Sequence, residues 1–203
     1  MKTFDKIIQK TDEWFQKRKG KITGTVLKDI MGTPYKRTEA IYEMIGDILA
    51  EGVEDQSENP MARGNRLEPE ARAMFGFYQS KSIKETGIAE SDNNRQIASS
   101  PDGLIGENEA LEIKCMGRKN HVKMWLTNKI PDEYEWQVIQ YFVVNSKLEK
   151  LYFVGYHPEI TVHPMHVIEV KREEVLSKIL SAEKAQEAFL LEVKNILSTI
   201  IEF

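Results

Sequence analysis

The chain has 203 residues, of which 41% are hydrophobic and 30% charged, as in a folded globular protein rather than a disordered or fibrous one. A chain of this length buries about 70% of the surface that it exposes when unfolded, so folding requires neither disulfides nor a structural metal. The single cysteine, Cys115, cannot form an internal disulfide, which predicts a reducing compartment. The net charge of −4 excludes a uniformly basic coat for nucleic acid, although basic residues gather locally at 17–21 and 118–123.

The N-terminal third has a helical pattern. Thr11 is a favourable N-cap for a first helix that Gly20 ends. A short helix is expected directly after residues 23–25, and Thr38 is expected to cap a third helix. A longer helix is expected over residues 61–78.

The remainder alternates between extended and helical patterns. Extended segments are expected at 82–89, 95–99, 104–105, 110–115, 151–156 and 165–170, with a four-residue hairpin turn at 106–109. Helices are expected at 119–128, at 132–144 and from about residue 173 onward. This order predicts an α/β (α+β) fold with a mixed central β-sheet flanked by helices. We expect one domain over 1–203, with N-terminal helices at 1–80, the sheet and its helices at 81–170, and a C-terminal helix at 171–203.

Two short segments carry the polar residues of greatest interest, SSPDG at 99–103 and LEIKC at 111–115. Strand residues two apart share a face, so the apolar residues of the second segment point one way while Glu112 and Lys114 point the other. A four-residue turn would place position 103 opposite 112, and Asp102 would lie next to Glu112. Two carboxylates and one amine are therefore expected to converge at the base of the hairpin.

Paired carboxylates of this kind suit a hard divalent cation. Mg²⁺ prefers oxygen ligands and usually accepts one or two carboxylates, with water and substrate phosphate completing its shell. A metal held by Asp102 and Glu112 can polarise a phosphodiester and activate water, and Lys114 can orient that water or neutralise developing charge. The alternative for Glu112 and Lys114 is an exposed cross-strand pair on a solvated hairpin.

Two helices add polar groups to this region. Glu68 lies at the edge of an apolar face, where a carboxylate needs a partner or a cation; that face contains Leu67, Ala71, Met74, Phe75 and Tyr78. Gln137 and Tyr141 are spaced i, i+4 and can both project towards the sheet. The alternatives are an exposed Glu68 in the first turns of its helix and a buried, hydrogen-bonded Gln137.

Taken together, these motifs resemble the PD-(D/E)xK nuclease superfamily and, more narrowly, the phage lambda exonuclease or YqaJ-type viral recombinase family. The resemblance runs from Trp14 to about Tyr156. It rests on the order and spacing of Trp14-x-x-x-Arg18-x-Gly20-x-Ile22-Thr23-x-Thr25, Gly64-x-x-x-Glu68-Pro69-x-Ala71-Arg72, Ser100-Pro101-Asp102-Gly103, Leu111-Glu112-Ile113-Lys114-Cys115 and Gln137-x-x-x-Tyr141.

The resemblance implies a restriction-endonuclease-like core and a Mg²⁺-dependent 5′-to-3′ exonuclease. Such an enzyme digests one strand of linear double-stranded DNA to mononucleotides and leaves 3′ overhangs for recombination by strand annealing. It implies one or two Mg²⁺ ions, with Mn²⁺ as a substitute, held by Asp102, Glu112, the backbone carbonyl of Ile113 and Glu68. Lys114 then lies at the attacking water.

The same resemblance implies roles for four further residues. Gln137 supports the metal site, and Arg18, Thr25 and Ser100 hold the 5′-terminal phosphate. A guanidinium with two hydroxyls suits an anion. Thr25 stands where a serine is more usual, and Met116 stands where a proline often follows the cysteine.

The resemblance also implies partners: double-stranded DNA ends that are preferably 5′-phosphorylated, a ring-shaped homotrimer and a single-strand annealing protein. No membrane is implied, and we expect a cytoplasmic protein in a bacterial host, encoded by a phage or prophage. Two other readings remain open. The chain can be an endonuclease of the same superfamily, acting in restriction or repair, or a non-catalytic scaffold that binds DNA ends. The intact acidic pair argues against the scaffold, since a binding module has no need of carboxylates facing an anionic backbone.

Several other residues have structural interpretations. The four histidines show no convincing metal spacing, and Cys115 faces away from Glu112 and is expected in the core. Trp125 and Trp136 are expected in the core or an interface, although an aromatic near a DNA channel can stack on a frayed base. The C-terminal helix is amphipathic and can serve the core or a subunit contact.

Overall fold

The computed structural model describes residues 1–49, 62–158 and 160–201, and it confirms the mixed α/β fold. The helices are α1 (Asp12–Arg18), α2 (Gly24–Ile30), α3 (Pro34–Leu49), α4 (Ala62–Gln79), α5 (Arg118–Thr127), α6 (Glu135–Val144) and α7 (Leu176–Ile201). The strands are β1 (Lys2–Thr3), β2 (Ala89–Glu90), β3 (Ala98–Ser99), β4 (Gly103–Ile105), β5 (Glu109–Lys114), β6 (Lys150–Tyr156) and β7 (Met165–Lys171). Two 3₁₀ turns, η1 (Asp132–Tyr134) and η2 (Arg172–Val175), precede α6 and α7. Within the described ranges, no helix combines the length and apolar character needed to cross a bilayer.

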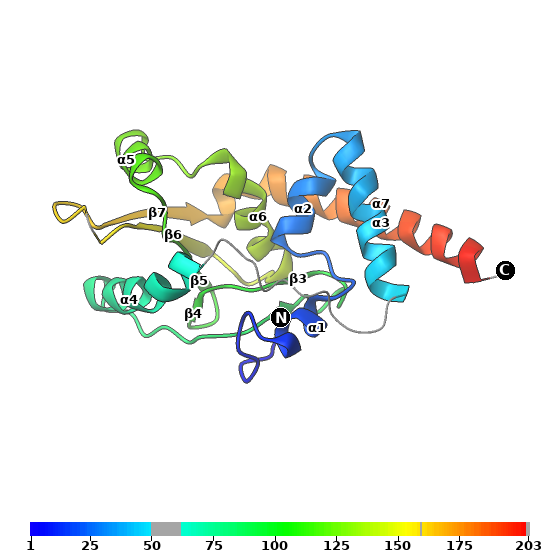
Figure 1. Cartoon of the computed structure of the whole chain (residues 1–203), viewed down its shortest axis with the longest axis horizontal. Helices are drawn as coiled ribbons and strands as arrows, with labels where there is room; N and C mark the ends of the chain where they lie inside the picture. The colour runs from blue at the N-terminus through cyan, green and yellow to red at the C-terminus, as the bar shows by residue number, and fades with distance from the viewer. Residues whose placement is uncertain (50–61, 159, 202–203) are drawn as a thin grey trace.

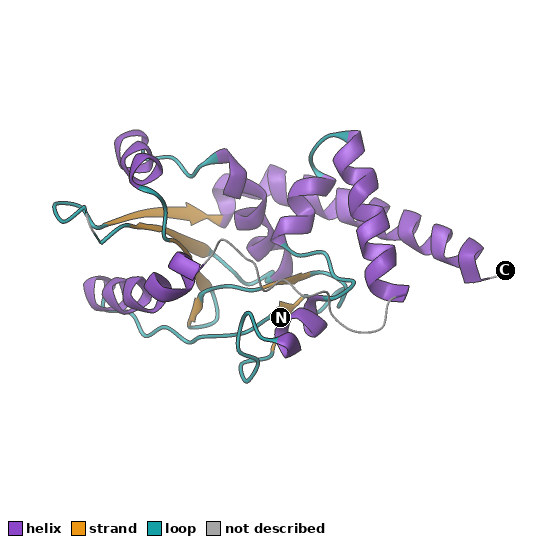
Figure 2. Cartoon of the chain, viewed as in Figure 1, coloured by secondary structure: helices purple, strands orange, loops and turns teal. Residues whose placement is uncertain are grey.

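A four-stranded sheet in the order β4-β5-β6-β7 forms the centre of the molecule. Strands β5 and β6 are parallel and the outer pairs are antiparallel, so the sheet is mixed as predicted. A parallel pair requires a crossover connection, which here contains α5 and α6. Helices surround these strands on several sides (Figure 2). A smaller antiparallel sheet has the strand order β1-β2-β3.

The two faces of β5 are covered by different helices. Leu111 and Ile113 pack with Leu67, Ala71 and Phe75 of α4. On the opposite face, α6 packs against the sheet, and the first half of α7 packs on α6 (Figure 1). Because strand residues alternate, Glu112 and Lys114 point to the α6 face. The predicted alternation along β5 is therefore confirmed, with both faces covered.

The hairpin prediction was right in position and wrong in register. The strands pair with Gly103 opposite Leu111 and Ile105 opposite Glu109, so the turn holds the three residues 106–108 rather than four. Gly106 has a φ of +61°, a left-handed conformation that glycine adopts without strain and that permits the tighter turn. Asp102, which immediately precedes Gly103, lies beside Glu112 in this register.

Three helix predictions need correction. Helix α3 begins at Pro34 rather than after Thr38, because proline is favourable at a first helical position and Thr33 accepts a hydrogen bond from the Lys36 amide, 3.4 Å away. Tyr78 was placed on the apolar face of α4 but is exposed, since the core contacts of that helix end near Phe75. The closing helix proper starts at Leu176, after the 3₁₀ turn η2.

The segments at 82–89 and 95–99 were expected to be extended strands, and they are mostly irregular. Only Ala89–Glu90 and Ala98–Ser99 form regular strands, and Lys84 makes a single bridge to Leu104. Buried polar groups explain why the chain is ordered there without long strands. Glu90, which is 2% exposed, accepts ion pairs from Lys17 and Lys21.

Candidate active site

The end of β5 brings the two predicted carboxylates together. Asp102 immediately precedes β4 and lies beside Glu112, and its amide donates to the Leu111 carbonyl, 3.1 Å away. The Asp102 Oδ2 atom accepts a hydrogen bond from the Ile113 amide at 2.7 Å. Asp102 is 9% exposed and Glu112 only 1% exposed. Two acidic side chains are thus removed from water at one point of the sheet.

Three donors hold the buried Glu112 carboxylate. The Gln137 Nε2 atom donates to Glu112 Oε1 at 2.7 Å, and the Lys114 ammonium lies 2.5 Å from the same oxygen. The Tyr141 hydroxyl donates to the other oxygen, Oε2. Buried charges in proteins require partners of this kind. The structure therefore excludes the alternative of an exposed cross-strand pair for Glu112 and Lys114.

The electrostatics show a site with excess negative charge. Burial, the Glu112 charge and the Glu68 charge raise the pKa of Asp102 well above its usual value. Burial alone would lower the pKa of Lys114, but Glu112 and Asp102 together raise it above its usual value. Burial and Glu112 likewise raise the pKa of Tyr141. Lys114 is therefore an ammonium, and Tyr141 is a neutral hydrogen-bond donor, at neutral pH.

Glu68 lies nearby, but cations neutralise its carboxylate. Arg72, one helical turn later in α4, donates to Glu68 Oε1 at 2.7 Å, and the Lys10 ammonium donates to Oε2 at 3.0 Å. The Arg72 Nε atom also donates to the Asp102 carbonyl at 2.8 Å. The alternative of an exposed Glu68 does not hold, since its side chain is only 18% exposed. Its role as a metal ligand stays a prediction.

The acidic pair fits the predicted cation by its chemistry. Asp102 and Glu112 are adjacent carboxylates whose mutual repulsion a divalent cation would relieve, and carboxylate oxygens are the ligands that Mg²⁺ prefers. No group of three or more His, Cys, Asp and Glu side chains poised for a metal occurs within the described residues. Ile113 is in place beside Asp102, and the use of its carbonyl as a ligand stays a prediction.

A second cluster surrounds the guanidinium of Arg18, at the end of α1. Its Nη1 donates to Ser100 Oγ at 2.9 Å, its Nη2 donates to Thr23 Oγ1 at 3.2 Å, and its carbon lies 4.1 Å from the centre of the Trp14 ring. Burial lowers the pKa of Arg18 to about 10. Among the described residues, the guanidinium contacts two neutral hydroxyls and a ring, and it forms no ion pair with a carboxylate. A half-buried cation with neutral partners is a suitable site for an anion.

The structure brings two of the three predicted phosphate ligands together. Arg18 and Ser100 are hydrogen bonded, whereas Thr25 is exposed in the first turn of α2. The hydroxyl that meets Arg18 belongs to Thr23, which sequence reasoning did not select because Thr23 and Thr25 both flank Gly24. Thr25 as a phosphate ligand stays a prediction. Arg72 was also missed, although its i, i+4 spacing from Glu68 was a usable signal.

The remaining chemical side chains lie apart from these clusters. Cys115 packs against the α4 side of the sheet, as predicted, on the opposite face from Glu112. His121 and His157 are buried, and the His121 Nε2 atom is 2.8 Å from the His163 carbonyl oxygen. Trp136 packs on the core, whereas Trp125 is 41% exposed and so is not a core residue.

Comparison with known proteins identifies the family. The model of the YqaJ-like viral recombinase domain matches residues 13–147, which is more than half of the chain. The chain belongs to this family. The matched region of this YqaJ-like recombinase contains both clusters, from Trp14 to Tyr141. Among curated proteins, none matches the chain.

Solved structures agree with the family assignment. The crystal structure of the alkaline exonuclease LHK-Exo from Laribacter hongkongensis is 28% identical, with a TM-score of 0.83 and coverage of 95% of this chain and 97% of that one. The crystal structure of LHK-Exo in complex with dAMP is 28% identical, with a TM-score of 0.84 and coverage of 94% and 96%. The YqaJ-like recombinase thus has the fold of an alkaline exonuclease, which supports a nuclease activity.

Proposed function

We propose that this YqaJ-like recombinase is a Mg²⁺-dependent 5′-to-3′ exonuclease that digests one strand of linear double-stranded DNA to mononucleotides. The observation that carries the proposal is the buried pair Asp102 and Glu112 with the Lys114 ammonium against it. The complex of LHK-Exo with dAMP supports a nucleoside monophosphate as the product class. The 3′ overhang left behind is the substrate for recombination by strand annealing.

The metal site would consist of Asp102 and Glu112, with the Ile113 carbonyl and Glu68 as further ligands. One or two Mg²⁺ ions, or Mn²⁺ in their place, would supply Lewis-acid activation of the phosphodiester and of water. To bind the metal ion, the Glu68 carboxylate would have to contact it alongside Lys10 and Arg72, or release these two residues. The acidic pair is therefore the primary part of the site.

The protein groups have separable roles around this pair. Gln137 and Tyr141 fix the orientation of Glu112, since each donates to a different carboxylate oxygen. Lys114 remains protonated, so it would orient the attacking water and neutralise charge that develops on the phosphate. Its position over the Tyr134 ring, 4.9 Å from the ring centre, restricts where the ammonium can move.

The Arg18 cluster would hold the terminal 5′-phosphate of the digested strand. Arg18 and Ser100 would make charge-assisted hydrogen bonds to it, with Thr25 at the exposed N-terminal turn of α2 as the third ligand. Thr23, already bound to the guanidinium, orients Arg18. Preference for 5′-phosphorylated ends follows from this arrangement.

By resemblance, we further propose a ring-shaped homotrimer and a single-strand annealing partner, acting in the cytoplasm of a bacterial host that carries the phage or prophage. Neither partner is needed for the test of the nuclease itself. That test uses the full chain with purified DNA.

The test compares a linear duplex with a covalently closed circle, each with Mg²⁺ or with EDTA. We expect release of mononucleotides from the linear duplex only, and only with Mg²⁺. Degradation of the circle would instead indicate the endonuclease alternative. Binding of ends without any cleavage would indicate the scaffold.

Two variants assign the clusters. Lys114→Ala should abolish cleavage and retain end binding, while Lys28→Ala, at an exposed lysine on α2, should behave as wild type. Arg18→Ala should reduce digestion of 5′-phosphorylated ends more than of 5′-hydroxyl ends. Full activity of Lys114→Ala, or equal effects of Arg18→Ala on both ends, would remove that residue from the mechanism.

A further inference from the structure

The Ser100 hydroxyl receives a second hydrogen bond to which the proposed function gives no role. The indole Nε1 of Trp14 donates to Ser100 Oγ at 3.2 Å, as well as to the Gly87 carbonyl at 2.9 Å. The Nη1 atom of Arg18 donates to the same Oγ at 2.9 Å. Indole and guanidinium N–H groups can only donate, and a serine hydroxyl has two acceptor lone pairs and one proton. Both lone pairs of the Ser100 hydroxyl are therefore in use.

The proton of this hydroxyl is left for a partner from outside. Among the described residues, the Ser100 hydroxyl donates to no acceptor, and Ser100 is only partly buried. A hydroxyl whose lone pairs are both occupied can make its next hydrogen bond only as a donor. The oxygens of a terminal phosphate are strong acceptors. Ser100 and Arg18 therefore present donors of matching kind to the same anion.

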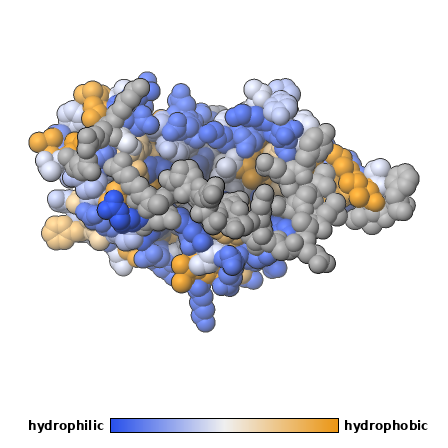
Figure 3. All heavy atoms as spheres, in the orientation of Figure 1, coloured by the Kyte–Doolittle hydropathy of each residue, from blue (hydrophilic) through white to orange (hydrophobic). Residues whose placement is uncertain are grey.

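The indole of Trp14 is held in place by its own helix and by a small apolar cluster. Trp14 and Arg18 are spaced i, i+4 on α1, and the ring centre lies 4.1 Å from the guanidinium carbon. The ring also packs on the cluster of Ile7, Ile88 and Ala98. Figure 3 shows mainly hydrophilic groups on the surface around α1, at the lower edge of the molecule. The indole thus serves the interior side of α1.

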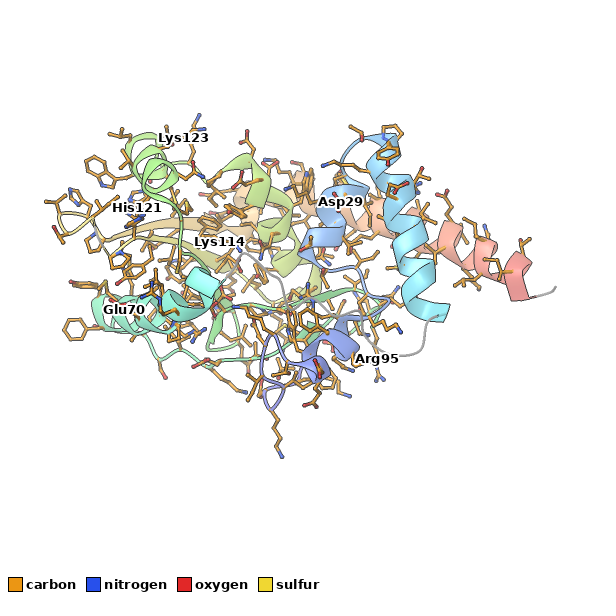
Figure 4. The ribbon with its side chains drawn as sticks, in the orientation of Figure 1. Asp29, Glu70, Arg95, Lys114, His121 and Lys123 are labelled. Carbon is orange, nitrogen blue, oxygen red and sulfur yellow. The ribbon has the colours of Figure 1, made fainter. Side chains whose placement is uncertain are left out.

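Main-chain contacts hold the segment of Ser100 against the end of α1. The Lys21 ammonium donates to the Arg95 carbonyl at 2.8 Å, and Figure 4 shows Arg95 beside α1. Ile22 pairs with Ile97 in a parallel bridge, three residues before Ser100. The indole, the guanidinium and the hydroxyl therefore belong to segments that are fixed relative to one another. Groups that are already in place need little reorganisation to bind an anion.

We propose that Trp14 is a positioning residue of the phosphate site, whose indole N–H directs the Ser100 proton towards the terminal 5′-phosphate. Without the indole, the hydroxyl could turn its proton elsewhere and offer a lone pair to the phosphate oxygens, which repel it. A terminal 5′-hydroxyl carries no charge and gains less from the oriented proton. Trp14 would therefore raise the preference for 5′-phosphorylated ends. The inference rests on the proposed function of the Arg18 cluster.

The test measures the ratio of affinities for a fluorescent duplex with a 5′-phosphate and the same duplex with a 5′-hydroxyl, using the full chain in EDTA. Trp14→Phe removes the N–H and keeps a ring over Arg18, and it should reduce this ratio about 3- to 10-fold. Ser100→Ala should reduce it about 10- to 100-fold. In the Ser100→Ala background, Trp14→Phe should leave the ratio unchanged, because its effect passes through the hydroxyl. The matched control is Trp125→Phe on α5, since the Trp125 N–H makes no hydrogen bond within the described residues.

Inorganic phosphate gives a second readout that tolerates a loss of stability in the variant. The rise in unfolding temperature that phosphate causes is measured within each protein, and it should be smaller in Trp14→Phe than in the wild type. An unchanged affinity ratio in Trp14→Phe would overturn the proposal. Equal fold reductions by Trp14→Phe with Ser100 and with Ser100→Ala would also overturn it, since Trp14 would then act by packing alone.

The same measurements separate this inference from the proposals beneath it. Equal affinity of the wild type for both duplex ends would overturn the phosphate site itself, and the role of Trp14 with it. A wild-type preference that Trp14→Phe retains in full would overturn the role of Trp14 alone. Digestion of linear duplex with Mg²⁺ is scored separately, so failure of the nuclease proposal is distinguishable from both.

Discussion

The hydroxyl of Tyr141 provides the sharpest test of how the acidic site is held. Tyr141→Phe removes a donor to the buried carboxylate of Glu112 and leaves the aromatic ring in place. Hydrogen bonds to charged groups contribute about 1.5–3 kcal/mol, so the free energy of unfolding should fall by that amount. At about 2–4 °C per kcal/mol for a chain of this size, the unfolding temperature in EDTA should fall by about 3–12 °C.

The same change should lower the rate of the chemical step. Glu112 would keep its bonds to Gln137 and Lys114 on Oε1 but lose the donor that fixes Oε2. Small displacements of a catalytic group cost up to about 100-fold, so we expect kcat to fall about 10- to 100-fold with little change in KM. Single-turnover digestion of a 5′-phosphorylated duplex measures the effect.

A double-mutant cycle decides whether this reasoning holds. Combined with Glu112→Gln, which removes the negative charge, Tyr141→Phe should show a coupling of about 1 kcal/mol or more in unfolding experiments. Equal costs of Tyr141→Phe in both backgrounds would refute the proposed interaction. Tyr152→Phe is the matched control, because its hydroxyl donates at 3.3 Å to Glu109, at the other end of β5, and its loss should cost less.

Three further predictions test the remaining contacts of the two clusters. Asp102→Asn should raise the unfolding temperature in EDTA, because it removes one of two buried carboxylates that repel each other. The same variant should lose the stabilisation that we expect Mg²⁺ to give the wild type, as measured by thermal unfolding with and without Mg²⁺. Arg18→Met should abolish stabilisation by inorganic phosphate, measured in the same way. Gly24→Ala should lower kcat about 10- to 100-fold in the digestion assay, because a Cβ atom there would lie 2.9 Å from Gln137 Cγ. The control is Gly117→Ala, where a Cβ atom would have no neighbour within 4 Å, and it should leave kcat unchanged.

The alternating pattern of β5 was predictable because it depends only on strand geometry. Whatever the register, Glu112 and Lys114 had to share a face, and residue 102 had to end near residue 112. The exact register was not predictable, because it depends on the conformation of Gly106, and loops of three and four residues fit the same sequence.

Contacts between distant segments account for what the sequence did not reveal. Lys10 meets Glu68 across 58 positions, and nothing in either local pattern indicates the pairing. The choice of Thr23 over Thr25 as the partner of Arg18 follows from where α2 begins, at Gly24. The first residue of a helix can be predicted from a sequence only to within one or two positions. A shift of that size exchanges Thr23 and Thr25 as the expected partner of Arg18.

The two clusters are joined by the chain itself. Ser100, which accepts a hydrogen bond from Arg18, stands two residues before Asp102, and the Ser100 carbonyl oxygen lies 3.3 Å from the Tyr141 hydroxyl. Two residues span at most about 7 Å, so the Arg18 cluster and the acidic pair cannot move apart. If Arg18 holds the terminal phosphate, the next phosphodiester of the strand is the one presented to Asp102. In the proposed exonuclease, a fixed separation of this length would favour release of one nucleotide at a time.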